Sequence, residues 1–144
     1  MRRVCLTAAA AALAIACGVS QSRELGVKEA ARVREMLNAE KYAEIYNSAS
    51  AEFKRTTTEQ QWVALCSGAR QKLGRWKQST VKDTQVLLVD SGGHIVIVDY
   101  ATDFETGPAT ERLVFFVQNG HAQLHGYNVN SPSLSRVDAG GNLH

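Results

Sequence analysis

The chain has 144 residues and lacks the residue spacings that mark common catalytic and metal sites. No Cys or His spacing resembles a zinc site, no glycine-rich loop opens a helix, and no serine sits in a nucleophile elbow. His121 and His125 share a face of one predicted strand, but four residues along a strand separate them by roughly 13 Å, too far to share a metal ion. The sequence therefore disfavours a hydrolase or a nucleotide enzyme, and we assign no catalytic residue, cofactor or metal.

A hydrophobic run long enough to cross a bilayer is also missing. The apolar run over residues 4–15 is too short for a permanent span. It follows Arg2 and Arg3 and ends in small residues before Cys17, a pattern typical of export signals. We predict that residues 1–16 are a signal peptide and that the protein is exported to the cell envelope, where it faces the periplasm.

The end of this leader is consistent with two kinds of processing. Ala16-Cys17-Gly18 fits a lipoprotein signal, although such signals prefer leucine three residues before the cysteine and Leu13 lies four before it. Residues 14–16 also satisfy the small-x-small rule of ordinary cleavage, which would release a soluble protein beginning at the same cysteine. We favour lipidation of Cys17, because a cysteine at this position is otherwise hard to explain. The predicted partner is then a membrane, reached through the lipid anchor.

An excess of basic residues is absent once the leader is removed. The whole chain has 16 Lys and Arg against 14 Asp and Glu, and the leader contains Arg2, Arg3 and no acidic residue. The mature chain therefore carries 14 residues of each sign and a formal net charge of zero. It has no overall electrostatic attraction for nucleic acid or for an anionic membrane surface.

Cysteines are too few for a disulfide framework. After removal of the leader, which contains Cys5, only Cys17 and Cys66 remain. If Cys17 is acylated, Cys66 is a lone thiol; if it is not, a bridge between the two stays open. Cys66 is predicted to be a buried and inert packing residue. It shares an apolar helical face with Trp62, Leu65, Ala69 and Leu73.

The mature chain is long enough for one domain with one core. Residues 17–27 are polar without a clear period, and we predict a tether there. Residues 28–129 form the predicted domain. Residues 130–144, which contain Ser131-Pro132 and Gly140-Gly141, are predicted to be disordered.

Three helices are predicted in the first half of the domain. Apolar stripes mark the first two: Ala30, Val33 and Leu37, and, after an interruption near Asn38, Tyr42, Ile45, Tyr46 and Ala49. The third helix begins at Thr58, which can form a capping box with Gln61, and it ends at Gly74.

Beyond Gly74 the hydrophobic period becomes alternating, which predicts strands. The predicted strands cover residues 75–83, 85–90, 94–104, 109–118 and 121–129. Residues 105–108 form a predicted loop, and Asn119-Gly120 is the strongest hairpin signal in the chain. Helices followed by an antiparallel meander predict an α+β domain, with the helices packed on one face of a curved sheet.

The two turns set a register that predicts a pocket. They place Val96, Val98, Tyr100 and Thr102 opposite Val117, Phe115, Leu113 and Glu111, and Gly126 opposite Leu113. The polar groups of this core face then gather at one end: Tyr100, Thr102, Glu111 and Asn128. Together they could orient a small or lipid-like ligand, or let Glu111 act as a base. The alternative is that Glu111 lies in water or pairs with Asn128 and has no chemical role.

The opposite face of the predicted sheet carries charge and an apolar strip. Arg112 is diagonal to Asp99 and Asp103, which predicts a surface charge cluster that keeps both acids ionised. Ile95, Ile97 and Phe116 lie on the same face. An exposed apolar strip is a liability unless a partner covers it, so a homodimer is a further hypothesis.

Several short motifs carry a family resemblance over most of residues 27–129. They are residues 42–53, Thr58-Glu59-Gln60-Gln61-Trp62, Leu73-Gly74, residues 98–104, Thr110-Glu111-Arg112-Leu113 and His125-Gly126-Tyr127. These motifs resemble a family of small exported bacterial domains of unknown function, similar in turn to the nuclear transport factor 2-like, cystatin-like group. The chain departs from the pattern at Gln123-Leu124-His125, where a tryptophan-arginine pair commonly precedes the glycine-tyrosine step.

The resemblance implies a cone, made from a bent sheet wrapped around helices, and a cavity, but no activity. Three hypotheses follow. The first is a non-enzymatic envelope protein that binds a small or lipid-like ligand or a partner through the open end of the cone. The second is a small isomerase or cyclase-like enzyme with Glu111 or Asp99 as base. The third is an assembly module that uses the apolar strip on the outer sheet face.

Overall fold

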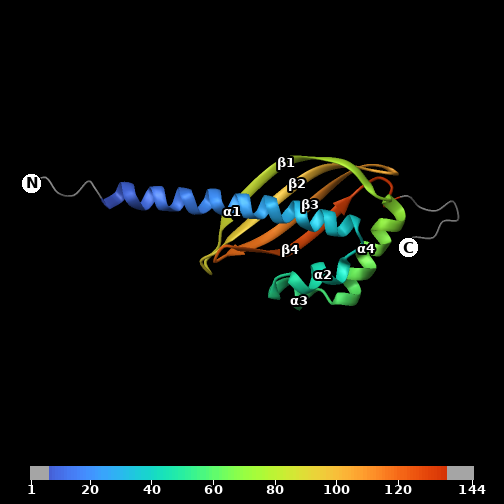
Figure 1. Cartoon of the computed structure of the whole chain (residues 1–144), viewed down its shortest axis with the longest axis horizontal. Helices are drawn as coiled ribbons and strands as arrows, with labels where there is room; N and C mark the ends of the chain where they lie inside the picture. The colour runs from blue at the N-terminus through green and yellow to red at the C-terminus, as the bar shows by residue number, and fades with distance from the viewer. Residues whose placement is uncertain (1–6, 136–144) are drawn as a thin grey trace, which may run out of the picture.

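The computed structural model describes residues 7–135, with side chains described from Cys17 onward, and shows four helices followed by four strands. The strands form one antiparallel sheet in the order β1-β2-β3-β4. The long helix α1 (Thr7–Asn38) crosses one face of this sheet, and its first part projects beyond the body (Figure 1). The protein is therefore an α+β domain with N-terminal helices packed on a four-stranded antiparallel sheet, and the sheet is not strongly curled.

Residues 17–27, predicted to be a tether, are instead part of α1. Ser22 and Gly26 are buried, and Ala30 and Val33 continue the buried side of the helix. Small residues at intervals of four let the helix axis come close to the sheet. Because Ser22 and Gly26 are not hydrophobic, the sequence shows no apolar stripe there that would predict a helix. At Gly26 the approach is so close that an added Cβ would lie 2.4 Å from Cγ1 of Val96. The predicted signal peptide, residues 1–16, lies partly in α1, and its residues 1–6 lie outside the described residues.

Three short helices follow. The predicted interruption near Asn38 is confirmed, since α1 ends there, and α2 spans Tyr42–Ser48. Helix α3 (Ala51–Thr56) was not predicted as a separate element; Ser50 begins it by accepting a hydrogen bond from the Phe53 amide. The predicted third helix is confirmed as α4 (Glu59–Leu73). Thr58 and Gln61 form its capping box, and Gly74 ends it with a φ of 76°.

The first two predicted strands are one continuous strand, β1 (Trp76–Leu88). The pairing of β1 with β2 (His94–Phe104) shifts register between Val81 and Asp83. A bulge inserts one residue on one strand and reverses the alternation of faces beyond it. The alternating hydrophobic pattern is interrupted between residues 83 and 85, which led to the prediction of two strands. The interruption is caused by a bulge within one strand.

The turn between β2 and β3 (Gly107–Gln118) has two residues, Glu105 and Thr106, and not the predicted four. Tyr100 consequently pairs with Glu111, and Thr102 pairs with Ala109. The predicted register is wrong by two residues. Because two residues are one full period of a strand, every side chain still lies on its predicted face.

The hairpin at Asn119-Gly120 is confirmed, since Gln118 pairs with His121 at the start of β4 (His121–Asn130). Further along, the register shifts between Val114 and Phe115, so that β4 gains one residue. Tyr127 therefore lies opposite Leu113 on the core face, and Asn128 lies opposite Arg112 on the other face. The prediction that Asn128 lies on the core face is wrong for this reason, and Tyr127 lies there instead.

The core lies between α1, the short helices and the inner face of the sheet, which we define by Val96, Val98, Leu113, Phe115 and Val117. The short helices add buried side chains that extend this core: Tyr42, Ile45, Phe53, Trp62 and Cys66. The prediction that Cys66 is a buried packing residue is confirmed, since its exposed fraction is 4%.

The chain after β4 stays attached to the body for a few residues. Asn130 is the last residue of β4, and the buried Ser131 donates a hydrogen bond from Oγ to the Pro108 carbonyl at 3.0 Å. The predicted disorder from residue 130 is therefore wrong at its start. The remainder of that prediction, residues 136–144, lies outside the described residues.

Candidate functional site

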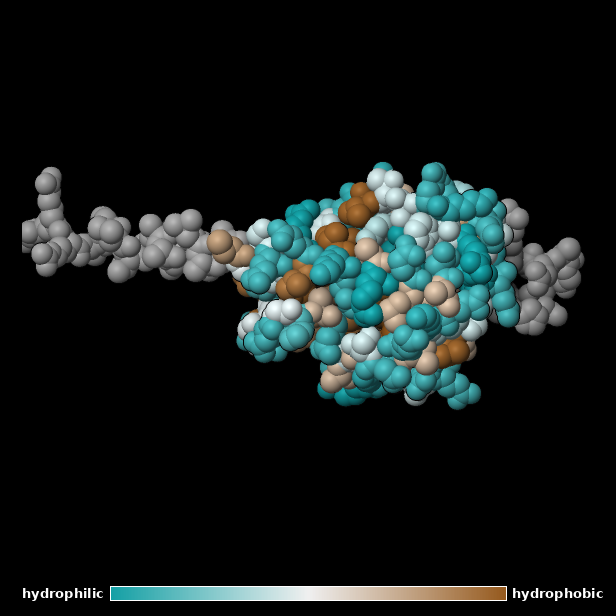
Figure 2. Space-filling view, in the orientation of Figure 1, coloured by the Kyte–Doolittle hydropathy of each residue, from teal (hydrophilic) through white to brown (hydrophobic). Residues whose placement is uncertain are grey.

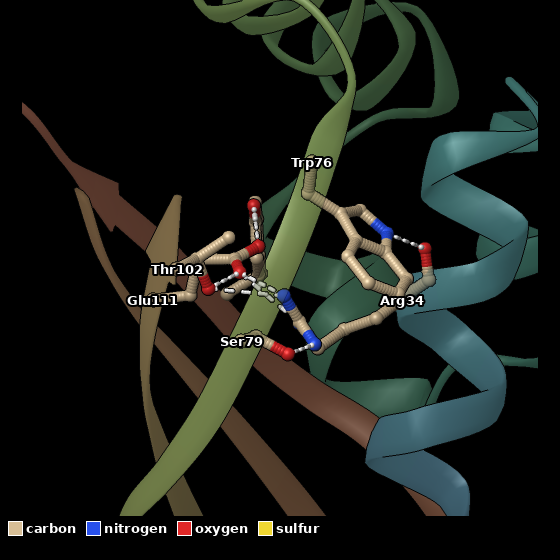
Figure 3. A network of polar contacts seen from close by, with 6 residues as sticks. Arg34, Trp76, Ser79, Thr102 and Glu111 are labelled. Atoms are coloured by element: carbon tan, nitrogen blue, oxygen red, sulfur yellow. Dashed lines mark hydrogen bonds and ion pairs between the residues drawn. The ribbon is translucent and has the colours of Figure 1, made fainter. Parts of the chain in front are cut away.

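Arg34 is a charged residue on the sheet-facing side of α1, and its side chain is 4% exposed. Its guanidinium forms an ion pair with Glu111 of β3, which is 3% exposed. Nη2 lies 2.7 Å and Nε 3.0 Å from the same carboxylate oxygen, Oε2. Figure 3 shows the guanidinium reaching from the helix to the sheet at the polar end of the core.

Neighbouring side chains complete the hydrogen bonds of this pair. Arg34 Nη1 donates to Ser79 Oγ at 2.6 Å, and Nη2 also donates to Thr102 Oγ1 at 3.0 Å. The Thr102 hydroxyl donates to Glu111 Oε2 at 2.5 Å, and the Tyr127 hydroxyl donates to Oε1 at 2.9 Å. We call these five residues the Arg34–Glu111 network.

Two aromatic rings enclose the guanidinium of Arg34. Its Cζ atom lies 4.2 Å from the centroid of the Tyr100 ring and 4.9 Å from that of the Trp76 ring. Each ring face attracts the cation while it excludes water from the ion pair. The Trp76 indole also donates to the Arg34 carbonyl at 3.4 Å, so the helix backbone is held together with the side chain.

The buried setting changes the acidity of the two phenols. Burial, together with the charge and hydrogen bond of Glu111, raises the pKa of Tyr127 well above its ordinary value. Burial also raises the pKa of Tyr100, while the nearby Arg34 opposes the shift. Both phenols therefore stay protonated at neutral pH, and Tyr127 remains a hydrogen-bond donor to Glu111.

The network leaves Glu111 poorly placed for proton transfer to a ligand. Oε2 accepts three hydrogen bonds, Oε1 accepts one, and the residue is almost fully buried. Within the part of the chain that the structure describes, no buried side-chain nitrogen or oxygen lacks a hydrogen-bond partner. A satisfied and enclosed ion pair holds the fold in one arrangement; it does not offer a free base to a substrate.

The structure brings together three of the four residues predicted to line a pocket. Tyr100, Thr102 and Glu111 meet around Arg34, whereas Asn128 is exposed on the opposite face. Arg34 itself was not predicted as a site residue. The available signal was its position four residues after Ala30, on the side of α1 that Ala30 and Val33 mark as buried.

A small cavity lies beside the network, on the side of α4. Its volume is about 40 Å³, and its lining includes Tyr42, Cys66, Arg70, Glu111 and Tyr127. This space holds a few water molecules at most, whereas ligand pockets have volumes of several hundred Å³. Burial raises the pKa of the Cys66 thiol to about 12, so its sulfur is an inert part of the cavity wall.

The outer face, which we define by Ile95, Ile97, Val114 and Phe116, is only half-buried. A hollow of about 600 Å³ lies on it between the β1–β2 turn and the start of α3. Apolar and polar groups both line this hollow: Ser50, Glu52, Val89, Ile95, Phe116 and His125. His125 is fixed there by a 3.0 Å hydrogen bond between its Nδ1 and Ser50 Oγ.

The predicted charge cluster on the outer face is present only in part. Arg112 is directly opposite Asp99 and binds both of its carboxylate oxygens, at 2.7 and 2.8 Å. Asp103 is not part of this pair and accepts a hydrogen bond from Gln78 instead. The hydrogen bond and charge of Arg112 hold the pKa of Asp99 below its usual value, so this carboxylate is ionised and is a poor base.

Metal ligands do not cluster in the described residues: no group of three or more His, Cys, Asp or Glu side chains lies close enough to hold an ion. His94 instead forms a 2.9 Å hydrogen bond through Nδ1 with Ser22 Oγ of α1. This contact fastens the helix to the beginning of β2.

The fold and the Arg34–Glu111 network define a small α+β domain whose polar site is closed by its own first helix. The chain belongs to a family of proteins of unknown function, DUF4019, whose model matches residues 29–127. The matched region contains the whole network, whereas Cys17 lies before it. A search of the curated proteins finds no match to the chain. Between residues 7 and 135, no helix has the length and hydrophobicity needed to cross a membrane.

Proposed function

We propose that this protein is exported and held at a membrane of the cell envelope by a lipid on Cys17, facing the periplasm, with a non-enzymatic binding or assembly role. The leader supports export through Arg2, Arg3 and the apolar run over residues 4–15, which ends directly before the cysteine.

The observation that carries the proposal is the contrast between the two cysteines of the mature chain. Cys17 is exposed on α1, five residues before Ser22, which is the first buried residue after it. Cys66 is enclosed in the core. An acyl group on Cys17 would therefore leave the packed body undisturbed, and Cys66 is not needed as its disulfide partner.

Two features support a binding or assembly role in place of catalysis. The predicted inner pocket is filled by Arg34, which donates two hydrogen bonds to Oε2 of Glu111. Thr102 also donates to Oε2, and Tyr127 donates to Oε1, so both carboxylate oxygens are already used. The outer face offers the larger hollow, with an apolar floor of Ile95 and Phe116 and a polar rim that includes Ser50 and His125. A small or lipid-like ligand, or a second copy of the chain, is therefore proposed to bind on the outer face.

The likeness to the nuclear transport factor 2-like group remains part of this proposal. The order of the elements, helices first and an antiparallel meander afterwards, supports it. The sheet is not strongly curled and a helix side chain occupies the inner end, so a ligand inside a cone is not favoured.

The alternative function, an isomerase or cyclase-like enzyme with an acidic base, has a direct test. Glu111→Gln removes the proposed base but keeps an oxygen that can accept the Tyr127 hydroxyl. A strain carrying this variant at normal abundance is expected to behave as wild type in any phenotype assay that the deletion strain fails. Loss of function at normal abundance would favour the enzyme.

The anchor is tested by growing the native bacterium with a radioactive fatty acid and fractionating its envelope. We expect label on the mature wild-type protein, which sediments with membranes, and none on the Cys17→Ser variant. Native mass spectrometry of the extracted protein then reports the acyl mass, any retained ligand and the number of subunits. An unlabelled wild-type protein in the soluble fraction would refute the lipid anchor, and a ligand-free monomer at micromolar concentration would count against the dimer.

A further inference from the structure

The structure has no flexible linker between Cys17 and the body of the protein. Helix α1 runs without interruption from Thr7 to Asn38. The first buried residue after Cys17, Ser22, forms a 2.9 Å hydrogen bond with His94, and Gly26 lies directly against Val96. Ser22 is five positions after Cys17 on the helix, a rise of about 8 Å. An anchor on Cys17 would therefore hold the body close to the bilayer.

Two exposed leucines, Leu87 and Leu88, lie at this same end of the sheet, whereas the third exposed leucine among the described side chains, Leu65, is on α4. Leu87 is 50% exposed and Leu88 is 70% exposed. Leu88 pairs with His94, the residue that binds Ser22, so the leucines lie at the level where α1 reaches the sheet. Figure 1 shows the β1–β2 turn at the end of the body from which α1 projects. In Figure 2 hydrophobic residues are spread over the visible face, and some of them lie toward that end.

The rest of β1 does not continue this apolar surface. Its exposed residues toward the other end are mostly polar, among them Lys77, Gln78, Thr80 and Lys82. Charged residues and bulges along an edge strand oppose pairing with another chain, so strand addition does not explain the leucines. The exposed leucines of β1 lie only at the end of the strand that is close to Cys17. A lipid on Cys17 would bring this end of the body to the bilayer, so the bilayer is the apolar surface that we expect the leucines to contact.

We propose that the corner formed by Leu87 and Leu88 rests in the membrane interface that holds the acyl chain of Cys17. This inference rests on the proposed lipid anchor and adds the orientation of the body. Two contacts with the bilayer, one through the lipid on Cys17 and one through Leu87 and Leu88, would then fix the orientation of the domain relative to the membrane. Apolar contact of the body with the bilayer would add to the membrane affinity that the lipid on Cys17 supplies. The outer face would stand at a fixed angle to the bilayer, available to ligands or to a second copy.

The test attaches an environment-sensitive fluorophore to Leu88→Cys in the full-length acylated protein, reconstituted in phosphatidylethanolamine and phosphatidylglycerol vesicles. Val81→Cys is the matched control, since Val81 is 43% exposed and lies on the same strand, farther from the anchor. Labelling is selective, because Cys66 is buried and Cys17 carries the lipid. We expect a blue shift of the Leu88→Cys label, quenching by nitroxide lipids and protection from iodide, and none of these at Val81→Cys.

Equal iodide quenching of the two labels on a protein of acylated mass would overturn the orientation and leave the anchor standing. An intact mass without the acyl group would overturn both. A second measurement uses Leu87→Ser combined with Leu88→Ser. This acylated variant should leave vesicles more readily than wild type when they are diluted, and unchanged retention would contradict the contact.

Discussion

Replacing Arg34 with methionine would test whether the Arg34–Glu111 network holds the helices on the sheet. Methionine keeps an unbranched side chain of similar length on α1 and removes the guanidinium. Glu111 would then be left 3% exposed without its counter-ion, with only Thr102 and Tyr127 as donors. Tyr100 and Trp76 would lose the cation that lies between their rings.

The expected loss is large compared with the stability of a small domain. Removing one partner of a buried ion pair costs about 3–5 kcal/mol, because a buried charge is left uncompensated. Native domains have unfolding free energies of only about 5–15 kcal/mol. With a urea m-value of about 2 kcal/mol/M, a loss of about 4 kcal/mol lowers the unfolding midpoint by about 2 M.

Urea unfolding of the Cys17→Ser chain, followed by tryptophan fluorescence, measures this loss. Arg112→Met is the matched control, since Arg112 also binds a carboxylate with two hydrogen bonds but is half exposed. We expect the midpoint of Arg112→Met to change little, because solvent screens an exposed pair. The double variant Arg34→Met, Glu111→Gln should recover part of the loss, since it no longer buries an unpaired carboxylate.

Two results would refute this reasoning. A midpoint for Arg34→Met no lower than that for Arg112→Met would mean that burial of the pair has no consequence for stability. Strict additivity of Arg34→Met and Glu111→Gln would mean that the two side chains do not interact energetically, since residues in one network normally show coupling of about 0.5–3 kcal/mol.

Three further predictions concern single positions. Gly26→Ala places a methyl group against Val96, and the overpacking should lower the free energy of unfolding by about 1–3 kcal/mol. Gly18→Ala, where an added Cβ has nothing within 4 Å, should instead stabilise the helix. Thermal unfolding of both variants measures these changes. Thr58→Ala removes a cap and should cost about 1 kcal/mol, measured by urea unfolding. Because burial raises the pKa of Cys66 from 9.0 to about 12, the unfolded thiol ionises first. Stability should therefore fall as pH rises from about 9 to 12, less so in Cys66→Ala.

Local signals in the sequence predicted most of the elements. Thr58 with Gln61, Gly74, and Asn119-Gly120 each set one boundary through nearby backbone hydrogen bonds, so no distant contact was needed. The β2–β3 register was wrong by two residues, yet the faces were right because two residues are one strand period. What the local signals missed are the bulges, where a single added residue reverses the faces beyond it.

The candidate site was predictable from the strands and not from the helix. Tyr100, Thr102 and Glu111 lie on one face by simple alternation. Their partner is 77 residues from Glu111 in sequence, and no local pattern reports such a pairing. Arg34 stands in a stripe of small and apolar residues, where a charged side chain is normally assigned to the surface. Because of the bulge in β4, Tyr127 contacts Glu111, whereas Asn128 had been predicted to lie beside it.

Helix α1 links the proposed anchor to the closed site. Its contacts with the body include those of Ser22, Gly26 and Arg34, all beyond the predicted cleavage point before Cys17. Removal of the leader would therefore take away none of these contacts. The same helix that carries Cys17 supplies the guanidinium that satisfies Glu111, so the helix cannot swing away from the sheet without exposing a buried carboxylate. A lipid on Cys17 would thus position the whole sheet, and the surface left for a ligand or a second copy is the outer face.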